Sequence, residues 1–77
     1  DTLSAKINLA VSYGRTGRVS ESLKLLEAAL PLSREVLGPE HPYTLNAMNN
    51  LANCYHKIGR LDEALELREE ERALRRK

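Results

Sequence analysis

The 77-residue chain contains no Phe or Trp and has only three Tyr, one Met and one Cys. Because the three tyrosines are scattered, no set of aromatic side chains offers a platform on which single-stranded bases could stack. The single cysteine, Cys54, excludes an internal disulfide. Its free thiol suits a reducing compartment, so we expect a cytoplasmic protein.

The chain also lacks an excess of one charge and any long apolar run. Twelve basic and eleven acidic residues give a net charge of +1, and the two signs are interleaved, especially over residues 60–77. This pattern does not favour a nucleic-acid or membrane surface. No apolar stretch approaches the roughly 20 residues that span a bilayer, and no signal peptide is visible. We therefore expect neither nucleic acid nor membrane as a partner.

A unit of 42 residues occurs nearly twice in the chain. Residues 1–35 align without a gap on residues 43–77, and 15 of the 35 positions are identical. A period of this length is the signature of stacked units that each bury an apolar face against a neighbour. Two units are fewer than the three or so that usually make a stable array. We expect a fragment of a larger repeat protein, with a marginal fold or one completed by partners.

Apolar residues recur at spacings of three and four, and no stretch alternates with a period of two, which predicts an all-α fold. Turn-forming residues divide the chain into four antiparallel helices. The expected helices lie at about 2–15, 20–36, 42–57 and 62–76. They form two helix-turn-helix repeats at 1–37 and 42–77, joined by a linker at 38–41.

Glycines and capping side chains predict where the helices end. Gly14 and Gly17 close the first helix and Gly59 closes the third, because glycine accepts left-handed dihedral angles. Ser20 and Asp62 are expected to begin the second and fourth helices, since their side-chain oxygens can accept hydrogen bonds from the free amides of a first turn.

Prolines mark the linker and one irregularity. In the segment 38–42, Gly38 can cap the second helix, and Pro42 can occupy the first turn of the third, where no amide hydrogen is needed. Pro31 falls inside the expected second helix and removes one backbone hydrogen bond there. We predict a kink or local break at Pro31 that the second repeat, with Ala73 at this position, does not share.

The pattern NLAxxYxxxGRxxE at residues 8–21 and again at 50–63 resembles the tetratricopeptide repeat. The 42-residue period and the linker are similar to the long variant of kinesin light chains and of repeats that follow nucleotide-binding domains in signalling proteins. The resemblance implies an α-solenoid with a right-handed superhelical tendency and one concave groove. It also implies binding of a protein or peptide, without catalysis or a cofactor.

By this resemblance, the first helix of each pair lines the groove. The candidate binding residues are Asn8 and Arg15 in the first repeat and Asn46, Asn49, Asn50, Asn53, His56 and Lys57 in the second. Each carboxamide offers a donor and an acceptor for the backbone of an extended peptide, and the basic residues attract an acidic group. The alternative is that Asn8 and Asn50 hydrogen-bond between neighbouring helices while the other asparagines are merely solvated.

The residues give no support for chemistry. Cys54 and His56 are two positions apart and therefore point to different faces of a helix, so they form no credible zinc set with His41. No nucleophile has a base at an interpretable spacing, and no glycine-rich phosphate loop follows a strand. We expect no enzyme, no metal and no cofactor.

The fourth helix carries Arg68, Glu71 and Arg72 where the second helix has apolar residues. This face either forms a polar cap toward water, which we favour, or belongs to a repeat that has diverged. Two further functions stay open. Copies could form a homo-oligomer through the face of Leu3, Ile7 and Ala10, which no preceding repeat covers. The chain could also be the regulatory sensor arm of a nucleotide-binding signalling protein.

Overall fold

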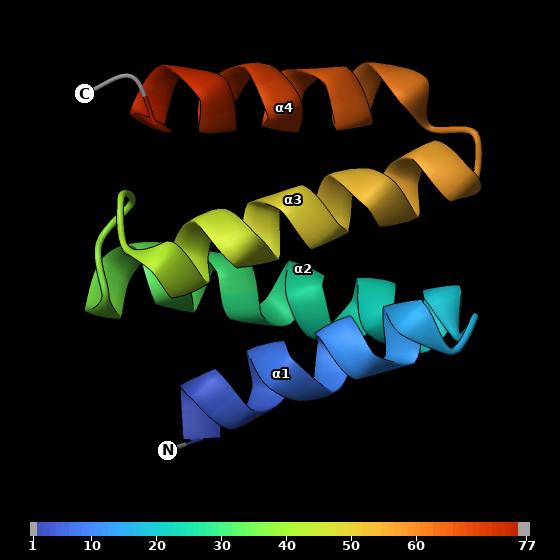
Figure 1. Cartoon of the computed structure of the whole chain (residues 1–77), viewed down its shortest axis with the longest axis horizontal. Helices are drawn as coiled ribbons and strands as arrows, with labels where there is room; N and C mark the ends of the chain where they lie inside the picture. The colour runs from blue at the N-terminus through green and yellow to red at the C-terminus, as the bar shows by residue number, and fades with distance from the viewer. Residues whose placement is uncertain (1, 76–77) are drawn as a thin grey trace.

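The computed structural model describes residues 2–75, which form four helices and no strand (Figure 1). The helices are α1 (Thr2–Arg15), α2 (Val19–Val36), α3 (Pro42–Lys57) and α4 (Leu61–Arg75). Consecutive helices run antiparallel and lie side by side in a flat slab of 31 × 30 × 16 Å. The predicted all-α fold of two stacked helix-turn-helix repeats is therefore confirmed.

The same tight turn connects the helices within each repeat. Gly17 and Gly59 have φ angles of 86° and 85°, which side chains with a Cβ rarely adopt. In the first turn the Arg18 N–H donates to the Tyr13 carbonyl at 2.8 Å, and the equivalent bond in the second turn has the same length. The two glycines therefore reverse the chain within three residues.

The predicted helix caps at Ser20 and Asp62 are wrong. The α2 helix begins at Val19, and its N-cap is Arg18, whose side chain makes no capping hydrogen bond. Asp62 lies inside the first turn of α4, which starts one residue earlier. The glycine turn brings the chain into a helical path immediately after the arginine, so no capping side chain is required at either start.

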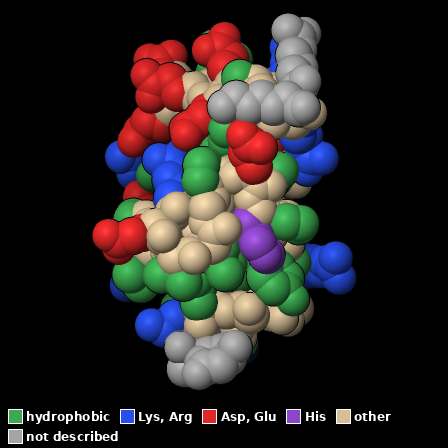
Figure 2. Space-filling model, turned by 90° about the vertical axis from the view of Figure 1, so that its left-hand side faces the viewer, with side chains coloured by type: hydrophobic (Ala, Val, Ile, Leu, Met, Phe, Trp, Pro, Cys, Tyr) green, Lys and Arg blue, Asp and Glu red, His purple; other side chains and the backbone are tan. Residues whose placement is uncertain are grey.

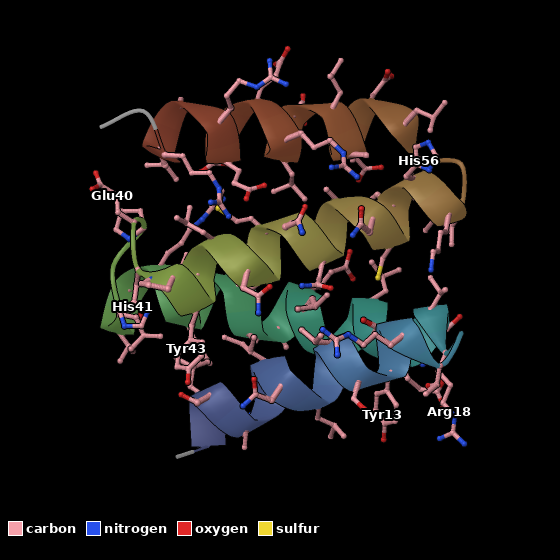
Figure 3. The ribbon with its side chains drawn as sticks, viewed as in Figure 1. Tyr13, Arg18, Glu40, His41, Tyr43 and His56 are labelled. Atoms are coloured by element: carbon pink, nitrogen blue, oxygen red, sulfur yellow. The ribbon has the colours of Figure 1, made fainter. Side chains whose placement is uncertain are left out.

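Three residues in and beside the linker between the repeats fix where α2 ends and α3 begins. Gly38 has a φ angle of 102°, and its N–H donates to the Ser33 carbonyl at 3.1 Å, which closes α2. Pro42 is the first residue of α3. His41 is the N-cap, and its Nδ1 accepts a hydrogen bond from the Tyr43 N–H at 3.1 Å (Figure 3). This bond gives His41 a structural role.

We predicted a kink or a local break at Pro31; the α2 helix is continuous there, so the break is absent, and the kink stays a prediction. Pro31 is exposed, whereas Leu30 before it and Ser33 after it are buried against neighbouring helices. Proline removes one backbone donor, but the contacts of the buried flanking residues hold the helix together on both sides. Tertiary packing therefore overrides the unfavourable helix propensity of proline at this position.

The core lies where α1, α2 and α3 meet. Ile7, Ala10, Leu26 and Met48 are all 0% exposed and belong to one cluster. The prediction that Ile7 and Ala10 lie on an uncovered face is therefore wrong, because the other helices of the same chain already cover them. Ile7 and Ala10 are therefore not available for a contact between copies, whereas Leu3 is half-buried, and the homo-oligomer itself stays a prediction.

The two repeats are joined by polar as well as apolar contacts. Ser33 of α2 and Thr44 of α3 are both 0% exposed, and their hydroxyl oxygens lie 2.6 Å apart. At the other end of the same helix pair, the Cys54 thiol donates to the Ser22 hydroxyl at 3.5 Å. These contacts set the antiparallel register of α2 and α3.

Candidate functional site

A hollow of about 340 Å³ opens where the ends of α1 and α3 meet the start of α2. The α1 and α3 helices both lie in front of α2 in Figure 1, on the side that faces the viewer. The hollow is lined by Gly14, Arg15, Val19, Ser22, Asn50, Asn53, Cys54 and Lys57. Its volume falls in the range of small-ligand and side-chain pockets.

Small residues form the floor of this hollow. Gly14 lies inside α1, and a Cβ added to it would be 3.4 Å from Ser22 Oγ, so the two helices approach closely here. Ser22 Oγ donates to the Ala10 carbonyl at 2.7 Å and accepts from the Cys54 thiol. Because these polar groups satisfy one another, the floor supplies shape rather than hydrogen bonds to a ligand.

Two basic side chains stand at the rim. Arg15 and Lys57 are 42 residues apart and so hold the same position in the two repeats. Both are exposed, and no acidic side chain is among the described residues that line the hollow. The rim is therefore positively charged and attracts an anionic group.

The two asparagines of the hollow are each half engaged. The Asn50 amide nitrogen donates to the Asn46 carbonyl at 2.8 Å and to Asn46 Oδ1 at 3.0 Å. Asn53 Oδ1 accepts from the Arg68 guanidinium at 2.5 Å. What remains is the Asn50 side-chain oxygen as an acceptor and the Asn53 amide as a donor. Together they match the N–H and C=O of an extended peptide backbone.

The structure brings together four of the eight residues predicted from the sequence. Arg15, Asn50, Asn53 and Lys57 line the hollow. The other four lie outside it: Asn8 is exposed on α1, Asn46 and Asn49 are half-buried on α3, and His56 is exposed in the last turn of α3 (Figure 3). The asparagine stripe of α3 is thus only partly directed into the hollow.

Sequence reasoning missed the floor of the hollow and the role of Arg68. The floor residues Gly14, Ser22 and Cys54 come from three different helices, so no single spacing relates them. One signal was present: Ser22 stands where the second repeat has Ala64, and a small polar residue in an alanine position calls for a nearby partner.

A second polar cluster joins the repeats on another face. The Tyr55 hydroxyl donates to Glu27 at 2.8 Å, and the Arg60 guanidinium lies 5.1 Å from the centre of the Tyr55 ring. Burial raises the pKa of Tyr55 to about 12, with further contributions from the hydrogen bond and charge of Glu27. Tyr55 is therefore a neutral hydrogen-bond donor that fastens α3 to α2. Arg18 lies over Tyr13 in the same manner at 5.7 Å (Figure 3).

Nothing in residues 2–75 forms a group of three or more His, Cys, Asp or Glu side chains placed to hold a metal ion. The thiol of Cys54 is buried and contacts the Ser22 hydroxyl. None of the helices in this part of the chain is long and apolar enough to cross a bilayer.

Comparison with known proteins gives a family and close structural relatives. The model of the tetratricopeptide repeat family matches residues 1–77. The chain is similar to crystal structures of nearly identical TPR-like repeats from a candidate kinesin light chain of Podosopora anserina. The first structure is 36% identical over 95% of this chain, with a TM-score of 0.77. A variant of the same protein is 36% identical over 94%, with a TM-score of 0.76.

The chain covers 35% and 34% of the lengths of these two relatives, about a third of each. No curated protein matches it.

Proposed function

Because the chain belongs to the tetratricopeptide repeat family, whose repeats generally serve protein–protein interaction, we propose that it binds an extended segment of a partner protein. The segment lies along α1 and α3 and places an acidic side chain in the hollow between the repeats. One observation carries this proposal: two basic side chains flank two half-engaged carboxamides above a floor that is already satisfied.

The asparagines and the basic residues of the hollow contact different parts of the peptide. Asn50 accepts a hydrogen bond from a peptide N–H, and Asn53 donates to a peptide carbonyl. Arg15 and Lys57 pair with the acidic side chain, which enters a pocket shaped by Gly14 and its neighbours. Electrostatic pairing at an exposed rim mainly affects the rate of association and its salt dependence.

The predicted residues outside the hollow extend this path. The peptide continues from the hollow along α3 past Asn49 and Asn46, and along α1 past Asn8. His56 borders the other end. No cofactor takes part, and the scaffold performs no chemistry.

We place this binding unit in a longer cytoplasmic repeat protein, because it spans about a third of its solved relatives. A role as the sensor arm of a nucleotide-binding signalling protein is the second candidate. It would use the same groove, so the choice between the two depends on the domains of the parent protein.

The test uses libraries of fluorescent eight-residue peptides, one with Asp or Glu fixed at the central position and a matched one with Asn or Gln there. Binding is followed by fluorescence anisotropy at low and high salt. The acidic library should bind more tightly, and Arg15→Ala or Lys57→Ala should weaken binding by about fivefold or more. Lys24→Ala, an exposed basic residue of α2 away from the hollow, is the matched control. Equal binding of both libraries would overturn the acidic anchor, and no binding at all would overturn the peptide role.

A further inference from the structure

The outer face of α4 holds the same position in the second repeat as the α2 face that packs against α3 holds in the first. The residues of the two faces differ in chemistry. Counting back 42 residues, the face formed by Arg68, Glu71, Arg72 and Arg75 corresponds to Leu26, Ala29, Leu30 and Ser33 on α2. On α2 those four residues are buried, and Ser33 contacts α3 directly. On α4 they line a shallow hollow of about 340 Å³. This face is where a helix equivalent to α3 would lie.

The basic charge of this face is only partly balanced. Glu71 pairs with Arg75 at 2.8 Å, whereas Arg68 donates to the neutral oxygen of Asn53. Arg72 adds a further positive charge in the same hollow. A helix laid over Arg68 and Arg72 would desolvate both guanidinium groups, which is costly unless the incoming helix supplies carboxylates.

Three of the six acidic residues of α4 line a different groove. Figure 2 shows acidic side chains gathered at the α4 end of the slab. Glu63, Glu66 and Glu70 line the groove between α4 and α2, and Glu70 there pairs with Arg34 at 2.8 Å. They therefore do not balance the arginines of the outer face.

The other half of the same face is apolar. Leu61 and Leu65 are 56% and 57% exposed and lie one turn apart on α4. Their equivalents on α2, Val19 and Leu23, are half-buried, and Val19 faces α3 across the hollow described above. The outer face of α4 thus has an apolar half at the start of the helix and a basic half toward its end.

From this division we infer that the outer face of α4, defined by Leu61, Leu65, Arg68 and Arg72, docks an amphipathic helix with an acidic half. The antiparallel register of α2 and α3 transfers to this contact. It places carboxylates of the incoming helix opposite Arg68 and Arg72 and apolar side chains opposite Leu61 and Leu65.

A second copy of the chain does not meet this description. The α1 helix, which would take the place of α3 in a head-to-tail contact, contains no acidic residue. It carries Lys6 at the position equivalent to Met48. Head-to-tail stacking would therefore bring Lys6 toward Arg72 and leave Arg68 without a carboxylate.

The test extends the chain after Lys77 with a copy of residues 36–57, which continues the 42-residue register and adds one helix. In the acidic version, glutamate replaces the residues that copy Met48 and Leu51, two buried α3 residues of the core cluster that also contains Leu26 and Leu30. In the apolar version they are unchanged. Urea unfolding of the parent and of both extended chains is followed by circular dichroism, at low salt and in 1 M NaCl.

The acidic version should raise the folding equilibrium constant about tenfold over the parent at low salt, and more than the apolar version does. High salt or the double change Arg68→Glu and Arg72→Glu should abolish the gain. An equal or larger gain with the apolar helix, or no gain with either, would overturn the inference. Light scattering of the parent chain gives an independent check: a dimer that Arg72→Glu dissociates would show that a second copy occupies this face.

Discussion

A buried pair of hydroxyl groups, Ser33 with Thr44, joins the two repeats, and Thr44→Val tests what it contributes to stability. The two oxygens are 2.6 Å apart, and Thr44 Oγ1 also lies 3.3 Å from the Ser33 carbonyl. One assignment of the protons satisfies both contacts: Thr44 donates to the carbonyl, and Ser33 donates to Thr44. Valine keeps the shape of threonine but removes both functions.

The magnitude follows from what each change leaves unpaired. Thr44→Val leaves the Ser33 hydroxyl buried without a side-chain partner, which costs about 1–3 kcal/mol. In a domain of this size each kcal/mol lowers Tm by roughly 4–8 °C. Ser33→Ala should cost less, because Thr44 keeps the carbonyl as its acceptor. In the double variant no hydroxyl is stranded, so its cost should be smaller than that of Thr44→Val alone.

Urea unfolding of the four proteins, followed by circular dichroism, measures this double-mutant cycle. Thr16→Val is the control, because the Thr16 hydroxyl bonds only to backbone carbonyls at an exposed turn and its loss should change stability by about 0.5 kcal/mol or less. Strictly additive costs of the two single changes would refute the reasoning, since the pair would then not act as a unit.

Four further changes probe other features. Pro31→Ala should stabilise the chain by about 1–3 kcal/mol in urea unfolding, because it restores a donor to the Glu27 carbonyl; an unchanged midpoint would show that the ring itself packs favourably. Burial, with the Glu27 hydrogen bond, raises the pKa of Tyr55 from 10.0 to about 12. The stability that the neutral Tyr55 hydroxyl contributes to the folded chain is therefore complete below pH 10 and is lost as pH rises through 12. Tyr55→Phe should remove that part of the alkaline decline, and identical declines would contradict this. In thermal melts Gly59→Ala should cost about 1–2 kcal/mol, since φ is 85°. Gly14→Ala, at a helical position with 3.4 Å to the nearest side chain, should be neutral or stabilising, and the reverse order would contradict both expectations.

Features governed by neighbouring residues were predictable from the sequence. The repeat, its helical periodicity and the glycines at positions 17, 38 and 59 together predict four helices and their connections. Gly17 is an example. It has a left-handed conformation, and the N–H of the arginine after it bonds back across the turn, so the arrangement depends only on residues close in sequence. The same glycine and arginine recur 42 residues later.

Features governed by contacts between helices were not predictable. The periodicity placed Ile7 and Ala10 on an apolar face, but a helix in a solenoid packs on more than one side, and spacing alone does not say which side meets which neighbour. The structure shows that α2 and α3 cover them. The hydrogen bonds of Asn53 with Arg68, and of Ser22 with Cys54, likewise depend on how two helices are rotated about their axes.

The α2 face that packs against α3 is largely apolar, whereas the equivalent outer face of α4 carries arginines. This difference affects how such an array could grow by gene duplication. Duplicating residues 1–42 would set the Leu26 and Ser33 face of α2 against a copy of α1, which keeps Leu9 and Tyr13 at the positions of Leu51 and Tyr55. Duplicating residues 36–77 would instead bury arginines against an apolar helix. A tandem copy of the first unit places Lys6 at the position of the fully buried Met48 and so requires a compensating substitution there, whereas a copy of the second requires several along α4. Arrays that carry this second unit should lengthen on its N-terminal side.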